Sequence, residues 1–264
     1  MESNFDKTIK SLSFDQHEIL YNIMQLHNNG EPFECDITYS KGAFYGDFTI
    51  TDLKGNKKDI TIPKPKYCCD VVPQQEDTIK IEPLGKLPFE DESIKSIVFD
   101  PPFVISIGPS LNGPAIDENG NKNNIIARRF ASYYPVNQLL DSYYHWMEEF
   151  NRVLKPNGII VVKTQQTITG SKSLNSPNYL WFLGNCLGLD TIDTFVLGSK
   201  ARLISGKVKK QGHARRFECE FQVFKKSRKL KIPYLDFASD ELIEKLMNDF
   251  VKYNLSKKRL KVKS

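Results

Sequence analysis

The chain has 264 residues, of which 40% are hydrophobic and 26% charged, and 37 Lys and Arg against 32 Asp and Glu give a formal net charge of +5. This composition is typical of a globular protein with a sizeable core and excludes a largely disordered chain or a fibre. The longest uncharged apolar runs are far shorter than the roughly 20 residues of a membrane-spanning helix. The N-terminus lacks a secretory or transit pattern, so we expect a cytosolic or nuclear protein.

The five cysteines are odd in number and contain no C-x-x-C pair, and no histidine lies close enough in sequence to complete a zinc set. Their one close pair is vicinal, at Cys68 and Cys69. We therefore expect reduced, mostly buried thiols and no metal site.

The N-terminal part of the chain predicts a helix followed by a short strand. Residues 13–28 place apolar side chains on one helical face, and Ser13 and Gln16 have the spacing of a capping box. A glycine-containing stop precedes a short strand at 33–36, which ends in a polar turn.

The next segment predicts extended structure without a helix. Residues 43–50 alternate and end at a turn at 52–56, and residues 60–62 read as extended, which indicates a hairpin between 43 and 62. Pro63 and Pro65 then exclude a helix before the extended run 67–72.

The middle of the chain predicts two buried parallel strands, at 78–82 and 96–99. Residues 108–135 are rich in Gly, Asn, Pro and Lys, which indicates a long loop of the kind that is usually functional. Apolar residues recur at helical spacing over 136–154, and a turn at 155–158 ends this helix.

In the rest of the chain, strands first alternate with helices, and the last two strands then follow each other without a helix between them. We expect a strand at 159–163, a polar loop at 164–176, a helix at 179–187, and strands at 191–197 and 217–224. This order predicts a mostly parallel α/β sheet, in which ligands gather at the carboxyl ends of the strands.

The sharpest feature is the tetrapeptide Asp100-Pro101-Pro102-Phe103 at the end of an apolar strand. The prolines have no N–H, so the carbonyls of Asp100 and Pro101 are free to accept hydrogen bonds. Phe103 adds a flat apolar face. A planar molecule that bears an amino group would suit this arrangement, although a strand-ending turn is the structural alternative.

This tetrapeptide resembles the (Asp/Asn/Ser)-Pro-Pro-(Tyr/Phe/Trp) signature of amino methyltransferases, which transfer a methyl group from S-adenosylmethionine to an exocyclic nitrogen of adenine or cytosine. Residues 87–94 resemble the "LPF-x-D-x-S" run before that strand in class I methyltransferases, and residues 152–158 resemble their "LKPGG" turn. The resemblance covers about residues 33–224. It implies a Rossmann-like class I methyltransferase fold with a mostly parallel, seven-stranded-type sheet and an antiparallel last strand.

The same resemblance implies a cofactor site. Residues 36–44 resemble the "DPxxGxGxF" loop, with Ser40 in place of the first glycine, and the predicted hairpin replaces the usual helix. Asp70 stands where the family places the acid that binds both ribose hydroxyls. The implied residues for S-adenosylmethionine are Asp36, Thr38, Gly42, Asp70, Leu87 and Asp100, and the implied catalytic residues are Asp100, Pro101, Pro102 and Phe103.

Loop 108–135 interleaves basic and aromatic residues, and residues 200–216 add a basic run in which acids are nearly missing. This pattern suits phosphates and unstacked bases, whereas a solvated charged face is the simpler alternative. The candidate nucleic-acid contacts are Lys122, Arg128, Arg129, Lys200, Arg202, Lys209, Lys210, His213, Arg215 and Arg216.

We therefore expect a DNA adenine-N6 methyltransferase. Asp in the first position of the tetrapeptide favours adenine in the family, although RNA enzymes often have Phe in the fourth. The alternatives are an RNA- or protein-directed methyltransferase of the same fold and an inactive, nucleic-acid-binding relative. The expected organisation is a helical segment at 1–32, a methyltransferase domain at 33–232, and a C-terminal helix and basic tail at 233–264, with the helix at 239–254 and the tail at 257–263.

Overall fold

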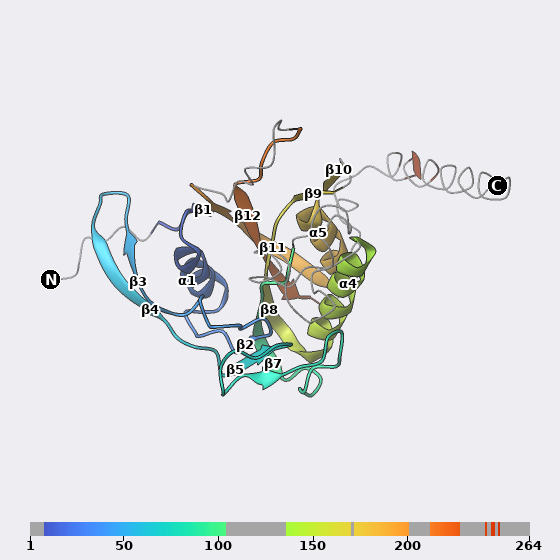
Figure 1. Cartoon of the computed structure of the whole chain (residues 1–264), viewed down its shortest axis with the longest axis horizontal. Helices are drawn as coiled ribbons and strands as arrows, with labels where there is room; N and C mark the ends of the chain where they lie inside the picture. The colour runs from blue at the N-terminus through green and yellow to red at the C-terminus, as the bar shows by residue number, and fades with distance from the viewer. Residues whose placement is uncertain are drawn as a thin grey trace, which may run out of the picture.

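The fold is built around a central eight-stranded sheet (Figure 1). This computed structural model describes residues 8–103, 136–169, 172–200 and 212–227, together with Glu241, Glu244, Lys245 and Asn248. The strands of the sheet are β1 (Leu12–Ser13), β2 (Cys35–Asp36), β5 (Tyr67–Asp70), β6 (Ile79–Lys80), β7 (Ile94–Phe99), β8 (Leu154–Thr164), β11 (Leu189–Gly198) and β12 (Glu218–Lys226). Their spatial order is β1-β11-β12-β8-β7-β2-β5-β6.

Strand direction confirms the predicted fold class. The last strand, β12, is antiparallel to both β8 and β11, and the other pairings are parallel. The chain runs outward from β2 to β5 and β6, then crosses to β7 on the other side of β2 and continues to β8. This is an α/β, Rossmann-like sheet of mostly parallel strands with the expected antiparallel last strand, to which β1 adds an edge strand. Ligands of such sheets bind outside the carboxyl ends of the strands where the strand order reverses, here between β2 and β7.

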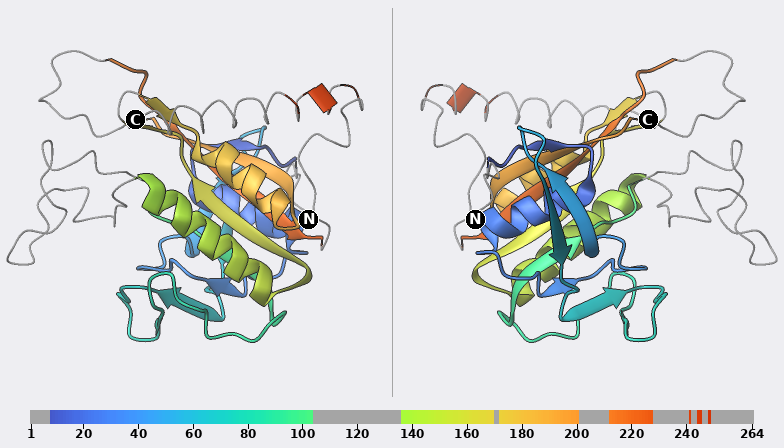
Figure 2. Two further views of the ribbon diagram at one scale, coloured as in Figure 1. Left: turned by 90° about the vertical axis from the view of Figure 1, so that its right-hand side faces the viewer. Right: turned by 90° about the vertical axis from the view of Figure 1, so that its left-hand side faces the viewer.

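Each face of the sheet is covered differently. Helix α1 (Gln16–His27) and the hairpin of β3 (Gly46–Thr51) and β4 (Lys57–Ile62) cover one face, whereas helices α4 (Val136–Val153) and α5 (Ser176–Cys186) cover the other (Figures 1 and 2). The predicted hairpin is therefore confirmed, with Gly46 opposite Ile62.

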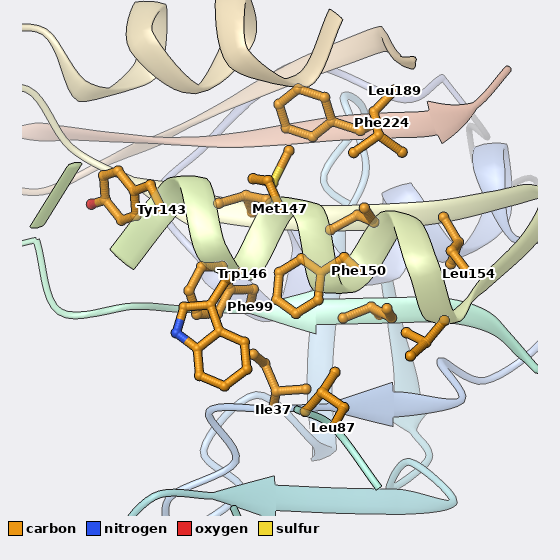
Figure 3. Packing of buried hydrophobic residues seen from close by; sticks show 14 of the residues in the cluster. Ile37, Leu87, Phe99, Tyr143, Trp146, Met147, Phe150, Leu154, Leu189 and Phe224 are labelled. Atoms are coloured by element: carbon orange, nitrogen blue, oxygen red, sulfur yellow. The ribbon is translucent and has the colours of Figure 1, made fainter. Parts of the chain in front are cut away.

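Packing against α4 fixes the strand that leads to the tetrapeptide. Phe99, the last residue of β7, lies edge-on to Phe150 with ring centroids 5.1 Å apart, and Trp146 stacks on Phe150 at 6.0 Å (Figure 3). These three rings are buried. The end of β7 is consequently held by a dense apolar contact, and Asp100 begins where that contact stops.

The start of α1 differs from the sequence prediction. Asp15 caps the helix, because its Oδ1 accepts from the backbone N–H of His17 at 2.8 Å. Ser13 belongs to β1 instead, and its hydroxyl donates to Glu18 at 2.5 Å. The prediction of a capping box was wrong because Ser13 takes part in strand pairing with β11.

Three further boundaries also differ. The predicted buried strand at 78–82 is the two-residue β6, which is parallel but exposed because it lies at the edge of the sheet. Strand β8 starts at Leu154 and not at residue 159 as predicted. The residues expected to form a turn at 155–158 belong to this strand, and Asn157 within it has a φ of +64°. The polar loop 164–176 contains a small hairpin of β9 (Thr167–Thr169) and β10 (Lys172–Leu174).

The five cysteines all lie in the described part of the chain and form no disulfide there, and three of them are buried. Helix α1 shares a core cluster with the sheet, so residues 8–32 pack on the same body as the strands that follow. The predicted loop 108–135, the basic tail 257–263 and most of the predicted helix 239–254 lie outside the described residues. In the part of the chain that the structure describes, no helix is long and apolar enough to cross a membrane.

Candidate active site at the carboxyl ends of the parallel strands

Three acids predicted from the sequence lie at the carboxyl edge of the sheet. Asp36 ends β2, Asp70 ends β5, and Asp100 follows β7. The loop after β2 ties them together. The hydroxyl of Thr38 accepts from the backbone N–H of Asp100 at 2.7 Å, and the backbone N–H of Ser40 donates to the Asp70 carboxylate at 2.8 Å.

Asp36 is the buried centre of this arrangement, with 1% of its surface exposed. Its Oδ1 accepts from the backbone N–H and the hydroxyl of Thr38 at 2.8 and 3.3 Å, and its Oδ2 accepts from the Tyr45 hydroxyl at 2.7 Å. Burial, together with the charge of Asp100, raises the pKa of Asp36 to about 7, and the hydrogen bonds from Tyr45 and Thr38 oppose this rise. Asp36 therefore anchors the loop and is close to protonation at neutral pH.

The loop has a glycine-like backbone at Ser40, the position where the resemblance leads us to expect a glycine. Ser40 has φ +50° and Gly42 has φ +73°, so both positions adopt the left-handed backbone. At Gly42, an added Cβ would lie 2.4 Å from the Tyr39 hydroxyl oxygen. Tyr39 in turn stacks on Tyr45 with ring centroids 5.7 Å apart. The backbone therefore accommodates a serine at position 40, whereas Gly42 has no room for a side chain.

Asp70 is partly exposed and accepts two backbone hydrogen bonds. Its Oδ1 accepts from the N–H of Val72 and its Oδ2 from the N–H of Ser40, both at 2.8 Å. Each carboxylate oxygen has two lone pairs, so each retains acceptor capacity for a hydroxyl. Asp70 thus has the chemistry that two vicinal hydroxyl groups require.

The tetrapeptide presents its acid at the same edge. Pro101 is buried, whereas Pro102 and Phe103 are partly exposed. The Asp100 side chain is 26% exposed, and its Oδ2 lies 3.1 Å from the Nζ of Lys163. Burial raises the pKa of the Asp100 carboxyl, and the Lys163 ammonium opposes that rise.

Sequence reasoning missed Lys163, which ends the apolar run of β8. Its Nζ lies 3.4 Å from the side-chain oxygen of Gln16 on α1 and sits over the rings of Phe44 and Phe221, 4.9 and 5.7 Å from their centroids. The available signal was a lysine at the carboxyl end of a buried strand, where an unpaired charge would be costly.

Leu87 lies in the hydrophobic core. It is 3% exposed, its N–H donates to the Glu149 carboxylate at 2.6 Å, and its carbonyl accepts from Arg152 at 3.2 Å. The structure therefore shows Leu87 holding α4 to the segment before β7, and its expected cofactor contact stays a prediction.

Some of the predicted basic contacts share the edge of the three acids. Since β11 is antiparallel to β12, and β12 to β8, the end of β11 and the start of β12 lie at the carboxyl end of β8. Lys200 and His213 are exposed there, and Arg215 and Arg216 are partly buried. The candidates Lys122, Arg128, Arg129, Arg202, Lys209 and Lys210 lie outside the described residues.

A polar cavity of about 160 Å³ opens near the junction of β8, β12 and α5. Its lining residues are Gln165, Gln166, Asn175, Glu218, Cys219 and Glu220. Burial and the neighbouring Glu218 raise the pKa of Glu220. Among the described residues, no group of three or more His, Cys, Asp and Glu side chains is arranged to hold a metal ion.

Comparison with known proteins gives structural likenesses alone. No protein-family model and no curated protein matches the chain. Among solved structures, the Thermus thermophilus protein TTHA0409, assigned as a DNA modification methylase and complexed with S-adenosyl-L-methionine, is 13% identical over 56% of this chain and 52% of its own, with a TM-score of 0.34. The cytosine-N4-specific PvuII DNA methyltransferase is 17% identical over 55% and 46%, with a TM-score of 0.37.

A third similar structure is a Burkholderia thailandensis 1,6-didemethyltoxoflavin-N1-methyltransferase with bound S-adenosylhomocysteine. It is 10% identical over 81% of this chain and 80% of its own, with a TM-score of 0.40. The chain spans about half the length of the two DNA methylases. The fold class therefore rests on the strand order of the sheet and not on these distant likenesses.

Proposed function

We propose that the chain is an S-adenosylmethionine-dependent methyltransferase that acts on the exocyclic amino nitrogen of a nucleobase, namely adenine N6 in DNA. The observation that carries this proposal is the position of Asp100-Pro101-Pro102-Phe103, which follows β7 at the point where the strand order reverses, beside Asp36 and Asp70. A tetrapeptide that is rich in acceptors and poor in N–H groups suits an incoming amino group at this point.

The residues at the edge fit the cofactor in chemistry. Asp70 retains acceptor capacity for the two ribose hydroxyls, and the left-handed backbone at Ser40 and Gly42 supplies a close-approach loop for the methionine end. When bound, S-adenosylmethionine supplies an electrophilic methyl group on a sulfonium centre.

The remaining chemistry belongs to this chain. The two N–H groups of the target amino group donate hydrogen bonds to the Asp100 carboxylate and the Pro101 carbonyl. These two hydrogen bonds direct the nitrogen lone pair away from the ring plane of the base. Phe103 stacks on the base. Positioning and the negative charge of Asp100 stabilise the cation that develops on nitrogen, and the proton leaves afterwards. A base in a duplex has to be flipped out to reach this site.

The experiment is mass spectrometry of nucleosides after DNA or RNA is incubated with the protein and cofactor carrying a deuterated methyl group. The expected product is labelled N6-methyladenine from DNA. Asp100→Ala should abolish it, while calorimetric titration still detects cofactor binding, and the exposed Asp59→Ala serves as the matched control.

The outcomes separate the alternatives. Methylation retained by Asp100→Ala would refute the assigned role of the tetrapeptide. A product found in RNA and not in DNA would favour the RNA enzyme. Failure of the wild-type protein to bind the cofactor at millimolar concentration would favour an inactive, nucleic-acid-binding relative.

A further inference from the structure

Lys163 is fixed by partners from four separate segments of the chain. Its Nζ contacts Asp100 after β7 at 3.1 Å and Gln16 on α1 at 3.4 Å. The same atom lies over the rings of Phe44, in the loop after β2, and Phe221, on β12. With 13% of its side chain exposed, Lys163 is a largely desolvated cation that has the Asp100 carboxylate as its charged partner.

We propose that Lys163 is the positioning residue of the acid in the methyl-transfer site: it holds Oδ2 of Asp100 so that Oδ1 is presented to the target amino group. This inference rests on the proposed function. It adds to the tetrapeptide a residue on the neighbouring strand β8. Lys163 also contacts the ring of Phe44, which lies in the loop that follows Asp36.

The geometry favours action through Asp100 over action on the substrate. A cation beside the target nitrogen would oppose the positive charge that develops there, whereas a cation bound to one carboxylate oxygen orients the other. The register of the sheet sets this pairing, because Phe99 lies opposite Val162 in parallel strands and the next residues are Asp100 and Lys163.

The charged groups around Asp100 make the role measurable. Lys163 faces it from β8, and Asp36 lies close by at the end of β2, hydrogen-bonded to Tyr45. Burial raises the pKa of Asp100 and Lys163 opposes the rise. Without the ammonium, Asp100 would have a buried acid as its neighbour, so its carboxylate should become harder to ionise.

The test compares Lys163→Met, Lys163→Gln and Lys163→Arg with Lys95→Met, an exposed lysine at the opposite end of β7. A ¹³C NMR titration of the Asp100 carboxyl, without cofactor, should show its pKa rising by about 1–3 in the Met and Gln variants. The Lys163→Arg variant should keep the pKa of Asp100 near its wild-type value, and Lys95→Met should leave that pKa unchanged. The glutamine variant covers a failure of the methionine variant to fold.

Kinetics supply the second readout. In the Met and Gln variants, the apparent pKa of the acid limb in the pH profile of kcat should rise by the same amount as the pKa of Asp100. One pH unit below that raised pKa, kcat should be about tenfold lower than its plateau value at higher pH. KM for S-adenosylmethionine should change little. If the wild-type protein is active and the Lys163 variants show the same acid-limb pKa and the same Asp100 pKa as the wild type, this inference is overturned and the proposed function is not. A wild-type protein that methylates no nucleobase would overturn the proposed function itself.

Discussion

Replacing Asp36 with asparagine should change how the stability of the protein depends on pH. Asp36 is buried at the end of β2 with three hydrogen-bond donors, from Thr38 and Tyr45. Its pKa is raised from 3.8 to about 7, and burial is the largest cause. The folded protein therefore prefers the neutral acid.

Proton counts give the sign of the effect. Between pH 4 and pH 7, the folded state holds a proton on Asp36 that the unfolded chain has largely lost. The contribution of Asp36 to the free energy of unfolding must then fall as pH rises across this window, by about 1.4 kcal/mol per pH unit. The full difference between the two pKa values corresponds to about 4 kcal/mol, which is present below pH 4 and lost above pH 7.

An asparagine side chain at this position does not titrate, yet its amide oxygen can still accept from the Thr38 backbone N–H. Urea unfolding of the wild type and Asp36→Asn, measured at intervals between pH 4.5 and pH 8, should give a difference in unfolding free energy that moves in favour of the variant as pH rises. The exposed Asp59→Asn is the control, and it should follow the wild type. A difference that stays constant with pH would refute the assignment of a raised pKa to Asp36.

Two other substitutions test the loop and the α4 anchor. Gly42→Ala forces a Cβ to 2.4 Å from the Tyr39 hydroxyl oxygen and should lower stability by about 1–3 kcal/mol and weaken cofactor binding. Gly55→Ala, with φ +86° but nothing within 4 Å, should have a smaller effect, and equal losses in urea unfolding would contradict the contact. Arg152→Met leaves the buried Glu149 carboxylate without its cation and should cost about 3 kcal/mol in the same assay, whereas unchanged stability would show that the pair is dispensable.

The fold was largely predictable because its signals are local. The apolar run ending at Phe99, the helical spacing in α4 and the alternation of the β3–β4 hairpin each define an element without knowledge of its neighbours. The exposure of β6 was not predictable, because burial at the edge of a sheet depends on what packs beside the strand and not on the apolarity of two residues.

The placement of the candidate site was predictable where the chain carries a linear motif, and it was not predictable where it depends on strand register. Asp36, Asp70 and Asp100 stand at the ends of three apolar runs, and the parallel sheet brings those ends to one edge. Lys163 reaches Asp100 because β7 and β8 pair with a register shift after Ile94. The register of that pairing is not encoded in either strand alone.

Under the proposed function, the distribution of charge along the carboxyl edge separates the residues proposed for chemistry from those proposed for substrate binding. Asp100 follows β7, whereas Lys200 follows β11, three strands away in the sheet, which is about 14 Å at ordinary strand spacing. Glu218 and Glu220 on β12 line the polar cavity between them. Arg215 and Arg216 precede β12 and Lys200 follows β11, so the positive charge that would attract a phosphate gathers at these strand ends, away from Asp100. A nucleotide flipped toward Asp100 would thus keep its neighbouring phosphates near the end of β11, where a cation strengthens binding without opposing the charge that develops on the target nitrogen.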